Sequence, residues 1–201
     1  MSIAHIQPNH DIKSRLSGLE GISDDQLNQH FEVYEDHVRA CNELLVQLNK
    51  ARVDGRKDHW IQDSRRRVAF ELNSVLLHEV FFSIIGRPSP MSDEFKETLT
   101  KHFGSVDLFL EELQSCATTR GVGWTVLFYD KLRDNMILSY VDLYQVGMLP
   151  LPIVCAFDHW EHGFASDFKG TTPDKAMKFF EALKKNIDWA AIEERFNNMN
   201  L

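Results

Sequence analysis

The chain has few cysteines, no excess of positive charge and no long apolar run, and each absence excludes a class of protein. The three cysteines (Cys41, Cys116 and Cys155) are odd in number and scattered, which indicates small buried side chains in a reducing compartment rather than a disulfide framework. The formal net charge of -8 argues against a nucleic-acid partner, because phosphate binding requires a basic face. The nearest feature to a basic cluster, residues 65–67, is interpreted as a solvated helix face.

Segments that would direct the chain to a membrane or out of the cell are also missing. No apolar run has the length needed to cross a bilayer. Residues 1–15 lack an apolar core flanked by positive charge, so no secretory signal is recognised. We therefore expect a cytoplasmic protein with no membrane partner and no nucleic-acid partner.

What is present is the composition of an ordinary globular protein, with 43% hydrophobic and 26% charged residues in 201. Two long helices are expected in the first half. Ser23 is a good N-cap and Gln26 completes a capping box. Apolar residues at three-and-four spacing continue to Asp54-Gly55, and a second helix is expected over about 59–85. The Gly- and Pro-rich residues 86–90 then mark the best domain boundary.

The second half has a mixed pattern. Its expected elements, in order, are helices at about 92–103 and 105–118, strands at 125–129, 136–141 and 152–157, and helices at 172–187 and 188–196. The predicted fold class is α followed by α+β: an N-terminal α-helical hairpin and then a three-stranded antiparallel sheet with flanking helices. The predicted units are an irregular arm (1–22), an α-hairpin domain (23–88) and an α+β domain (89–201).

Potential metal ligands follow the last expected strand. Asp158 lies at its end and His162 comes four residues later, and these residue types suit iron, manganese or zinc. Two ligands alone do not hold a catalytic metal, but His30 and His78 lie on the two long helices in apolar surroundings. Either histidine taken alone is more often a buried side chain that hydrogen-bonds a neighbour. No zincin motif, Cys-x-x-Cys pair or paired Glu-x-x-His helices are found.

The stretch Asp158-His159-Trp160-Glu161-His162 matches the Asp-x-Trp-Glu-His signature of the iron/manganese superoxide dismutases, which the chain resembles from Ser23 to Phe196. Other agreeing stretches, in order, are the first helix with His30, residues 73–82 with His78, Gly121-Val122-Gly123-Trp124, and the tail from Asp188 to Phe196. The family's fold is the one that the pattern predicts.

This resemblance implies several properties of the site. His30, His78, Asp158 and His162 would bind one iron or manganese ion per chain, with solvent as the fifth ligand. The substrate would be superoxide, which is dismutated to dioxygen and hydrogen peroxide. The protein would be a homodimer in which Glu161 reaches a ligand of the partner subunit. The alternative for Glu161 is a solvated side chain at a helix start.

The chain departs from the family in its first helix. Typical members carry a second histidine four residues after the first ligand and a gateway tyrosine eight residues after it. Here Tyr34 lies at four and His37 at seven. At about 100° per residue, a regular helix directs His30, Tyr34 and His37 the same way. We expect His37 to take the gateway position, and the alternative is a half-exposed surface histidine.

Two further departures concern the surroundings of the metal. In the family, a glutamine or histidine that hydrogen-bonds the metal-bound solvent often lies a few residues before a glycine. Counting back from Gly147 reaches Tyr144, with Gln145 beside it. A phenol donates a hydrogen bond but would tune the metal differently from an amide. In the family, a tyrosine and the residue at the position of Tyr34 together link the subunits. In this chain Ala165 replaces that tyrosine. His37, Tyr144 and Glu161 are thus the candidate catalytic residues.

Two other functions remain open at this stage. The altered surroundings, His37 and Tyr144, would suit another redox or oxygen-activating reaction at the same metal. Alternatively, a non-enzymatic interaction protein would retain the four ligands for folding. Composition does not select iron over manganese, because both accept this ligand set.

Overall fold

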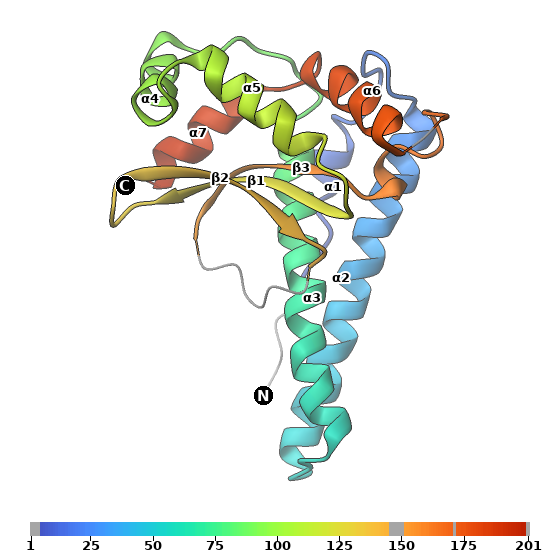
Figure 1. Cartoon of the computed structure of the whole chain (residues 1–201). Coiled ribbons are helices and arrows are strands. Elements are labelled where there is room, and N and C mark those ends of the chain that lie inside the picture. Colours follow the sequence, from blue (N-terminus) through green and yellow to red (C-terminus); the bar gives the residue numbers. More distant parts are fainter. Residues whose placement is uncertain (1–4, 145–150, 171, 200–201) are drawn as a thin grey trace.

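The computed structural model of the chain describes residues 5–144, 151–170 and 172–199. Helices α2 (Asp24–Val53) and α3 (His59–Ser83) form a long antiparallel pair. One end of α3 lies behind a small sheet, and the other end of the pair projects away from the body (Figure 1). The helices of the second half of the chain gather on the other side of the sheet (Figure 1). The fold is the expected one, a helical hairpin followed by a three-stranded antiparallel sheet with flanking helices.

The hairpin follows from capping signals at both of its helix starts. The Ser23 hydroxyl accepts a hydrogen bond from the Gln26 amide, and the Asp58 carboxylate accepts one from the Ile61 amide. Between the helices, Gly55 has a φ of +68°, a left-handed conformation that favours glycine. α2 is a continuous α-helix without a bulge, as expected. The predicted capping box is only half formed, because the Gln26 side chain bonds a distant loop instead of Ser23.

The N-terminal arm is more ordered than expected. Residues 10–13 form a one-turn helix, α1 (His10–Lys13), with Asn9 as its N-cap. Four apolar side chains spaced along the arm are buried: Ile12, Leu16, Leu19 and Ile22. A single turn is too short to leave a periodic pattern, which is why this helix was not predicted.

The second half begins with α4 (Asp93–Phe103) and α5 (Val106–Ala117), capped by Ser92 and Ser105 as expected. The strands are β1 (Gly123–Asp130), β2 (Asn135–Asp142) and β3 (Ile153–Asp158), and both outer strands pair antiparallel with a wholly buried β1. α6 (Thr172–Lys184) and α7 (Trp189–Met199) complete the chain. The expected helix over 172–187 stops three residues early, and beyond its end the Asn186 side chain hydrogen-bonds the backbone of Glu20.

Gly123 connects the sheet to the end of β3. A Cβ at this position would lie 2.2 Å from the Val141 carbonyl oxygen, so no larger residue fits without moving backbone. The Gly123 carbonyl accepts a hydrogen bond from the His159 amide at 2.9 Å. Since β3 also packs on α3, Asp158 is held between the sheet and the hairpin. Among the described helices, none combines the length and apolarity needed to span a membrane.

Candidate metal centre

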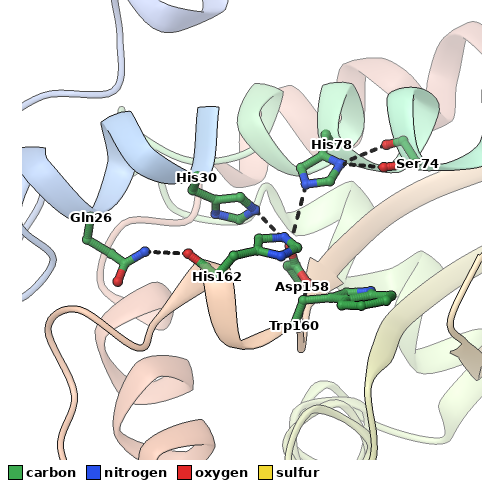
Figure 2. A network of polar contacts seen from close by, with 7 residues as sticks. All are labelled: Gln26, His30, Ser74, His78, Asp158, Trp160 and His162. Carbon is green, nitrogen blue, oxygen red and sulfur yellow. Dashed lines mark hydrogen bonds and ion pairs between the residues drawn. The ribbon is translucent and has the colours of Figure 1, made fainter. Parts of the chain in front are cut away.

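Four side chains from four separate elements converge between the hairpin and the sheet (Figure 2). They are His30 on α2, His78 on α3, Asp158 at the end of β3, and His162 on the short 3₁₀ helix η1 (Glu161–Gly163). One potential ligand atom from each lies within 4.8 Å of all the others. The Asp158 Oδ2 atom is 2.7 Å from Nε2 of His30, 3.1 Å from Nε2 of His162 and 3.7 Å from Nε2 of His78.

The polar atoms of this cluster fit a bound cation. His30, His78 and Asp158 are almost wholly buried, and the His162 side chain is 21% exposed. Nε2 of His30 and Nε2 of His78 are buried, and neither makes a hydrogen bond of ordinary geometry within the described residues. Buried polar atoms usually have a partner, so these two nitrogens indicate a missing one. Three imidazole nitrogens and one carboxylate oxygen are donors that suit iron or manganese.

The protonation states of the cluster favour metal binding. Burial lowers the pKa of His30, and burial together with the neighbouring His30 lowers the pKa of His78 well below its usual value. Both imidazoles therefore stay neutral at neutral pH and keep a lone pair. Burial alone would raise the pKa of Asp158, but His162 and His30 outweigh it and hold that pKa well below its usual range. The carboxylate is therefore ionised.

Hydrogen bonds outside the cluster orient the side chains within it. Nδ1 of His78 donates to the Ser74 carbonyl at 2.8 Å, which leaves Nε2 free to face the cluster (Figure 2). The Trp160 amide donates to Asp158 Oδ1 at 2.7 Å, which leaves Oδ2 for the same point. Sequence reasoning missed Ser74, although a residue four positions before His78 lies one helical turn away and its carbonyl was a foreseeable acceptor.

Gln26 joins the start of α2 to the loop that carries His162. Its side-chain nitrogen donates to the His162 carbonyl at 2.6 Å, and its side-chain oxygen accepts from the Ser166 amide at 2.9 Å (Figure 2). Gln26 is 1% exposed and lies one turn before His30. The same residue thus links the backbones that carry two of the four converging side chains. The capping-box interpretation had assigned Gln26 a different role.

His37 and Tyr34 share the face of α2 that carries His30, but their polar atoms have different partners. The His37 ring centre is 5.9 Å from that of His78, and its Nδ1 lies 2.6 Å from Glu71 Oε2. The Tyr34 hydroxyl instead donates to Glu79 at 2.9 Å. Burial raises the pKa of Tyr34, so this phenol stays protonated.

Tyr144 lies against the cluster through its aromatic neighbours. Its ring stacks on Trp160 with centres 4.9 Å apart and 9° between the planes, and it lies 5.4 Å from the ring of His37. The Tyr144 hydroxyl is buried near the Ser74 and Trp124 side chains, but among the described residues no contact of this hydroxyl meets hydrogen-bond geometry. Burial raises its pKa, so the phenol keeps its proton. Gln145, the other register considered, lies outside the described residues.

Glu161 and Ala165 lie at the outer side of the cluster and are exposed. Among the residues that the structure describes, the Glu161 carboxylate makes no hydrogen bond or ion pair, although its carbonyl accepts from the Ala165 amide at 2.7 Å. Another residue that sequence reasoning missed is Glu71, which Arg67 and His37 both contact. The interpretation of residues 65–67 as a solvated helix face is confirmed, with the Arg66 side chain 83% and the Arg67 side chain 51% exposed, although Arg67 also contacts the buried Glu71.

Comparison with known proteins agrees with the fold. The family model for the C-terminal domain of iron/manganese superoxide dismutases matches residues 91–195, just over half of the 201-residue chain. An iron superoxide dismutase from Aquifex aeolicus is 29% identical over 98% of this chain and 93% of its own length. One from Methanothermobacter marburgensis is 28% identical over 89% of each chain. A manganese superoxide dismutase from Mycobacterium intracellulare is 27% identical over 92% of this chain and 90% of its own. The chain therefore belongs to the iron/manganese superoxide dismutase family.

Proposed function

We propose that this protein dismutates superoxide to dioxygen and hydrogen peroxide at a single iron or manganese ion bound by His30, His78, Asp158 and His162. The observation that carries the proposal is the convergence of four potential ligand atoms within 4.8 Å. Membership of the family, with relatives named for both iron and manganese, supports the reaction and the choice of metals.

The bound metal would supply the electron transfer, since iron and manganese alternate between two oxidation states, whereas zinc does not. The chain's own residues determine its surroundings. Asp158 contributes one negative charge, and the Ser74 carbonyl keeps the proton of His78 on Nδ1, away from the cluster. Burial of three of the four side chains excludes bulk water. This burial favours a small substrate over a large one.

Peroxide formation consumes two protons for every two superoxide ions, so a buried centre needs groups that deliver them. We assign the gateway role to His37, whose side chain is 16% exposed and whose ring centre lies 5.9 Å from that of His78. We assign hydrogen-bond donation toward the centre to Tyr144, because its buried hydroxyl is protonated and lacks an ordinary partner in the described part of the chain. Both groups come from positions at which the family usually has other residues.

We further propose that the protein is a cytoplasmic homodimer whose interface includes Glu161. The support for the dimer is that this carboxylate is exposed immediately before a residue of the cluster, where a second subunit would cover it. The support for a reducing compartment is that all three cysteines are unpaired, two of them buried.

A second candidate function is a different redox or oxygen-activating reaction at the same centre. The observation that favours it is the pair formed by His37 and Tyr144, with ring centres 5.4 Å apart. A non-enzymatic interaction protein on this scaffold is the third candidate. It would retain the four cluster residues for folding alone.

The test loads purified protein separately with iron, manganese and zinc, and measures superoxide decay after a rapid pulse. We expect turnover in proportion to bound iron or manganese. The zinc-loaded protein has the same ligands without redox chemistry, so it serves as the inactive control. Full iron and manganese occupancy without turnover would favour the second candidate, and failure to bind either metal would favour the third.

A further inference from the structure

Three side chains form a continuous chain of contacts from the surface of the hairpin to the cluster. Arg67 Nε lies 2.6 Å from Glu71 Oε1, and Glu71 Oε2 lies 2.6 Å from Nδ1 of His37. The exposed fractions of these side chains are 51% for Arg67, 3% for Glu71 and 16% for His37. The guanidinium of Arg67 also covers the Phe70 ring at 4.1 Å. A buried carboxylate therefore lies directly behind the proposed gateway residue.

The position of Glu71 beside His37 follows from equal spacings along the two antiparallel helices. His37 follows His30 by seven residues, and Glu71 precedes His78 by seven. Seven residues are two turns, or about 10.5 Å, and bring a side chain back to nearly the same face. Because α2 and α3 are antiparallel, seven residues forward in α2 and seven back in α3 both lead toward the hairpin tip. The His37–Glu71 pair thus lies two turns outward from His30 and His78.

The contact fixes which nitrogen of His37 carries a proton. An ionised carboxylate only accepts hydrogen bonds, so Nδ1 of His37 must donate to Glu71 and Nε2 is the nitrogen left available. Burial alone would raise the pKa of Glu71, but the hydrogen bond from His37, together with Arg67, outweighs it and leaves the pKa below its usual value. Glu71 is therefore an ionised acceptor, and the exposed guanidinium of Arg67 compensates its charge.

We propose that Glu71 is a positioning residue for His37: it holds the imidazole by Nδ1 and presents Nε2 to the approach beside Tyr144. The proposal rests on the gateway role assigned to His37 under the proposed function. Arg67, together with the hydrogen bond from His37, keeps Glu71 ionised. Glu71 itself touches neither substrate nor metal. Its effect passes through the orientation of His37.

The alternative is that Arg67, Glu71 and His37 only stabilise the hairpin, and nitrogen-15 NMR of the imidazole rings in metal-free protein separates the two. At alkaline pH a free histidine side chain is neutral and prefers its proton on Nε2. We expect His37 in the wild type to carry it on Nδ1. Glu71→Met should move it to Nε2, whereas Glu71→Gln should retain Nδ1–H because its amide oxygen still accepts. A His37 ring that is unchanged in Glu71→Met would overturn the proposal.

Turnover of the metal-loaded enzyme supplies a second readout. Glu71→Met should lower the rate about 10- to 100-fold at unchanged metal content, as is typical when a supporting hydrogen bond is lost. Combining it with His37→Phe should give no loss beyond that of His37→Phe alone, because both act through one imidazole. Asp63→Asn is the matched control, since it removes an exposed carboxylate–arginine pair from the same helix. Additive losses, or a full rate in Glu71→Met, would overturn the proposal.

The two readouts also separate this proposal from the function on which it rests. If the wild type fails to turn over superoxide, the proposed function is wrong, whatever the NMR result. If the wild type turns over superoxide but its His37 carries the proton on Nε2, the positioning role of Glu71 is wrong and the function stands.

Discussion

At the scale of single residues, side chains of the centre use one polar atom for a hydrogen bond to the backbone and direct another toward the cluster. His78 uses Nδ1 for the Ser74 carbonyl and leaves Nε2 to the cluster. Asp158 uses Oδ1 for the Trp160 amide and leaves Oδ2. Each side chain is thus oriented by one atom and available through the other. This division orients the side chains that we propose as metal ligands.

Glu79 gives a prediction about stability and pH at the same scale. Burial raises the pKa of Glu79, against the opposing effects of the Tyr34 hydrogen bond and of Arg195. Because the folded-state pKa lies above the unfolded one, this group's contribution to the free energy of unfolding is fully present below the unfolded pKa. It is lost as pH rises through the folded pKa. Glu79→Gln removes the charge and keeps an acceptor for Tyr34.

We therefore expect Glu79→Gln to raise the free energy of unfolding relative to wild type at pH 7, and to have a smaller effect at pH 4. Urea denaturation of the metal-free proteins at both pH values measures this. Glu97→Gln, an exposed glutamate on α4, is the control and should differ little from wild type. An equal difference between Glu79→Gln and wild type at both pH values would show that the charge of Glu79 is not responsible.

At the scale of secondary-structure elements, local signals predicted most helix starts. Ser23, Ser92 and Ser105 cap helices as their sequence context indicates. The sequence did not reveal which side chains hydrogen-bond a partner that is distant in the chain. Gln26 lies 136 residues from His162, so no local spacing could show that it leaves the capping box for that carbonyl. The role of Glu71 was hidden for the same reason, 34 residues from His37.

The four residues of the cluster were more predictable than their surroundings. The spacing between Asp158 and His162 is a local feature of a specific signature. His30 and His78 lie on predicted helices in apolar surroundings, and the resemblance then implied their role. The side chains of Tyr34 and His37 share a face in any regular helix, but only the tertiary structure decides that Tyr34 bonds Glu79.

Removing the Gln26 side chain tests whether this link between elements matters for the centre. Gln26→Ala leaves the His162 carbonyl and the Ser166 amide without their partner, and each such loss costs about 1–3 kcal/mol when the group is buried. We expect a less stable metal-free protein and a metal affinity about 10- to 100-fold lower. Competition with a chelator measures the affinity.

The matched control is Gln29→Ala, which removes an exposed hydrogen bond to the Ser166 hydroxyl from the same loop. This variant should bind metal as the wild type does. If Gln26→Ala also keeps the wild-type affinity, then the loop holds His162 in place without help from α2.

At the scale of the whole molecule, the centre belongs to neither half of the chain. Two of its side chains come from the hairpin and two from the end of β3 and the turn after it. The packing of β3 on α3 brings these pairs together. The boundary at residues 88–89 stays a prediction, and a hairpin expressed alone would carry only half of the cluster.

The proposed homodimer is also a property of the whole molecule. Sedimentation should give about twice the chain mass, the C₂ dimer being the commonest oligomer. Glu161→Ala should shift the protein toward monomer or loosen the metal, because the proposed interface includes this carboxylate. Glu97→Gln again serves as a control, since its side chain lies on α4, away from the cluster. A monomeric wild type with full metal content would rule out the interface.

The most direct test of the metal centre is elemental analysis of the wild type and of His78→Ala after expression in medium rich in iron and manganese. We predict about one iron or manganese ion per wild-type chain and loss of most of it in His78→Ala, because a three-ligand remnant lacks affinity and geometry. His102→Ala, a histidine outside the cluster, should keep the wild-type content. A folded wild type that repeatedly purifies with little of either metal, or a His78→Ala protein that retains all of it, would contradict the account.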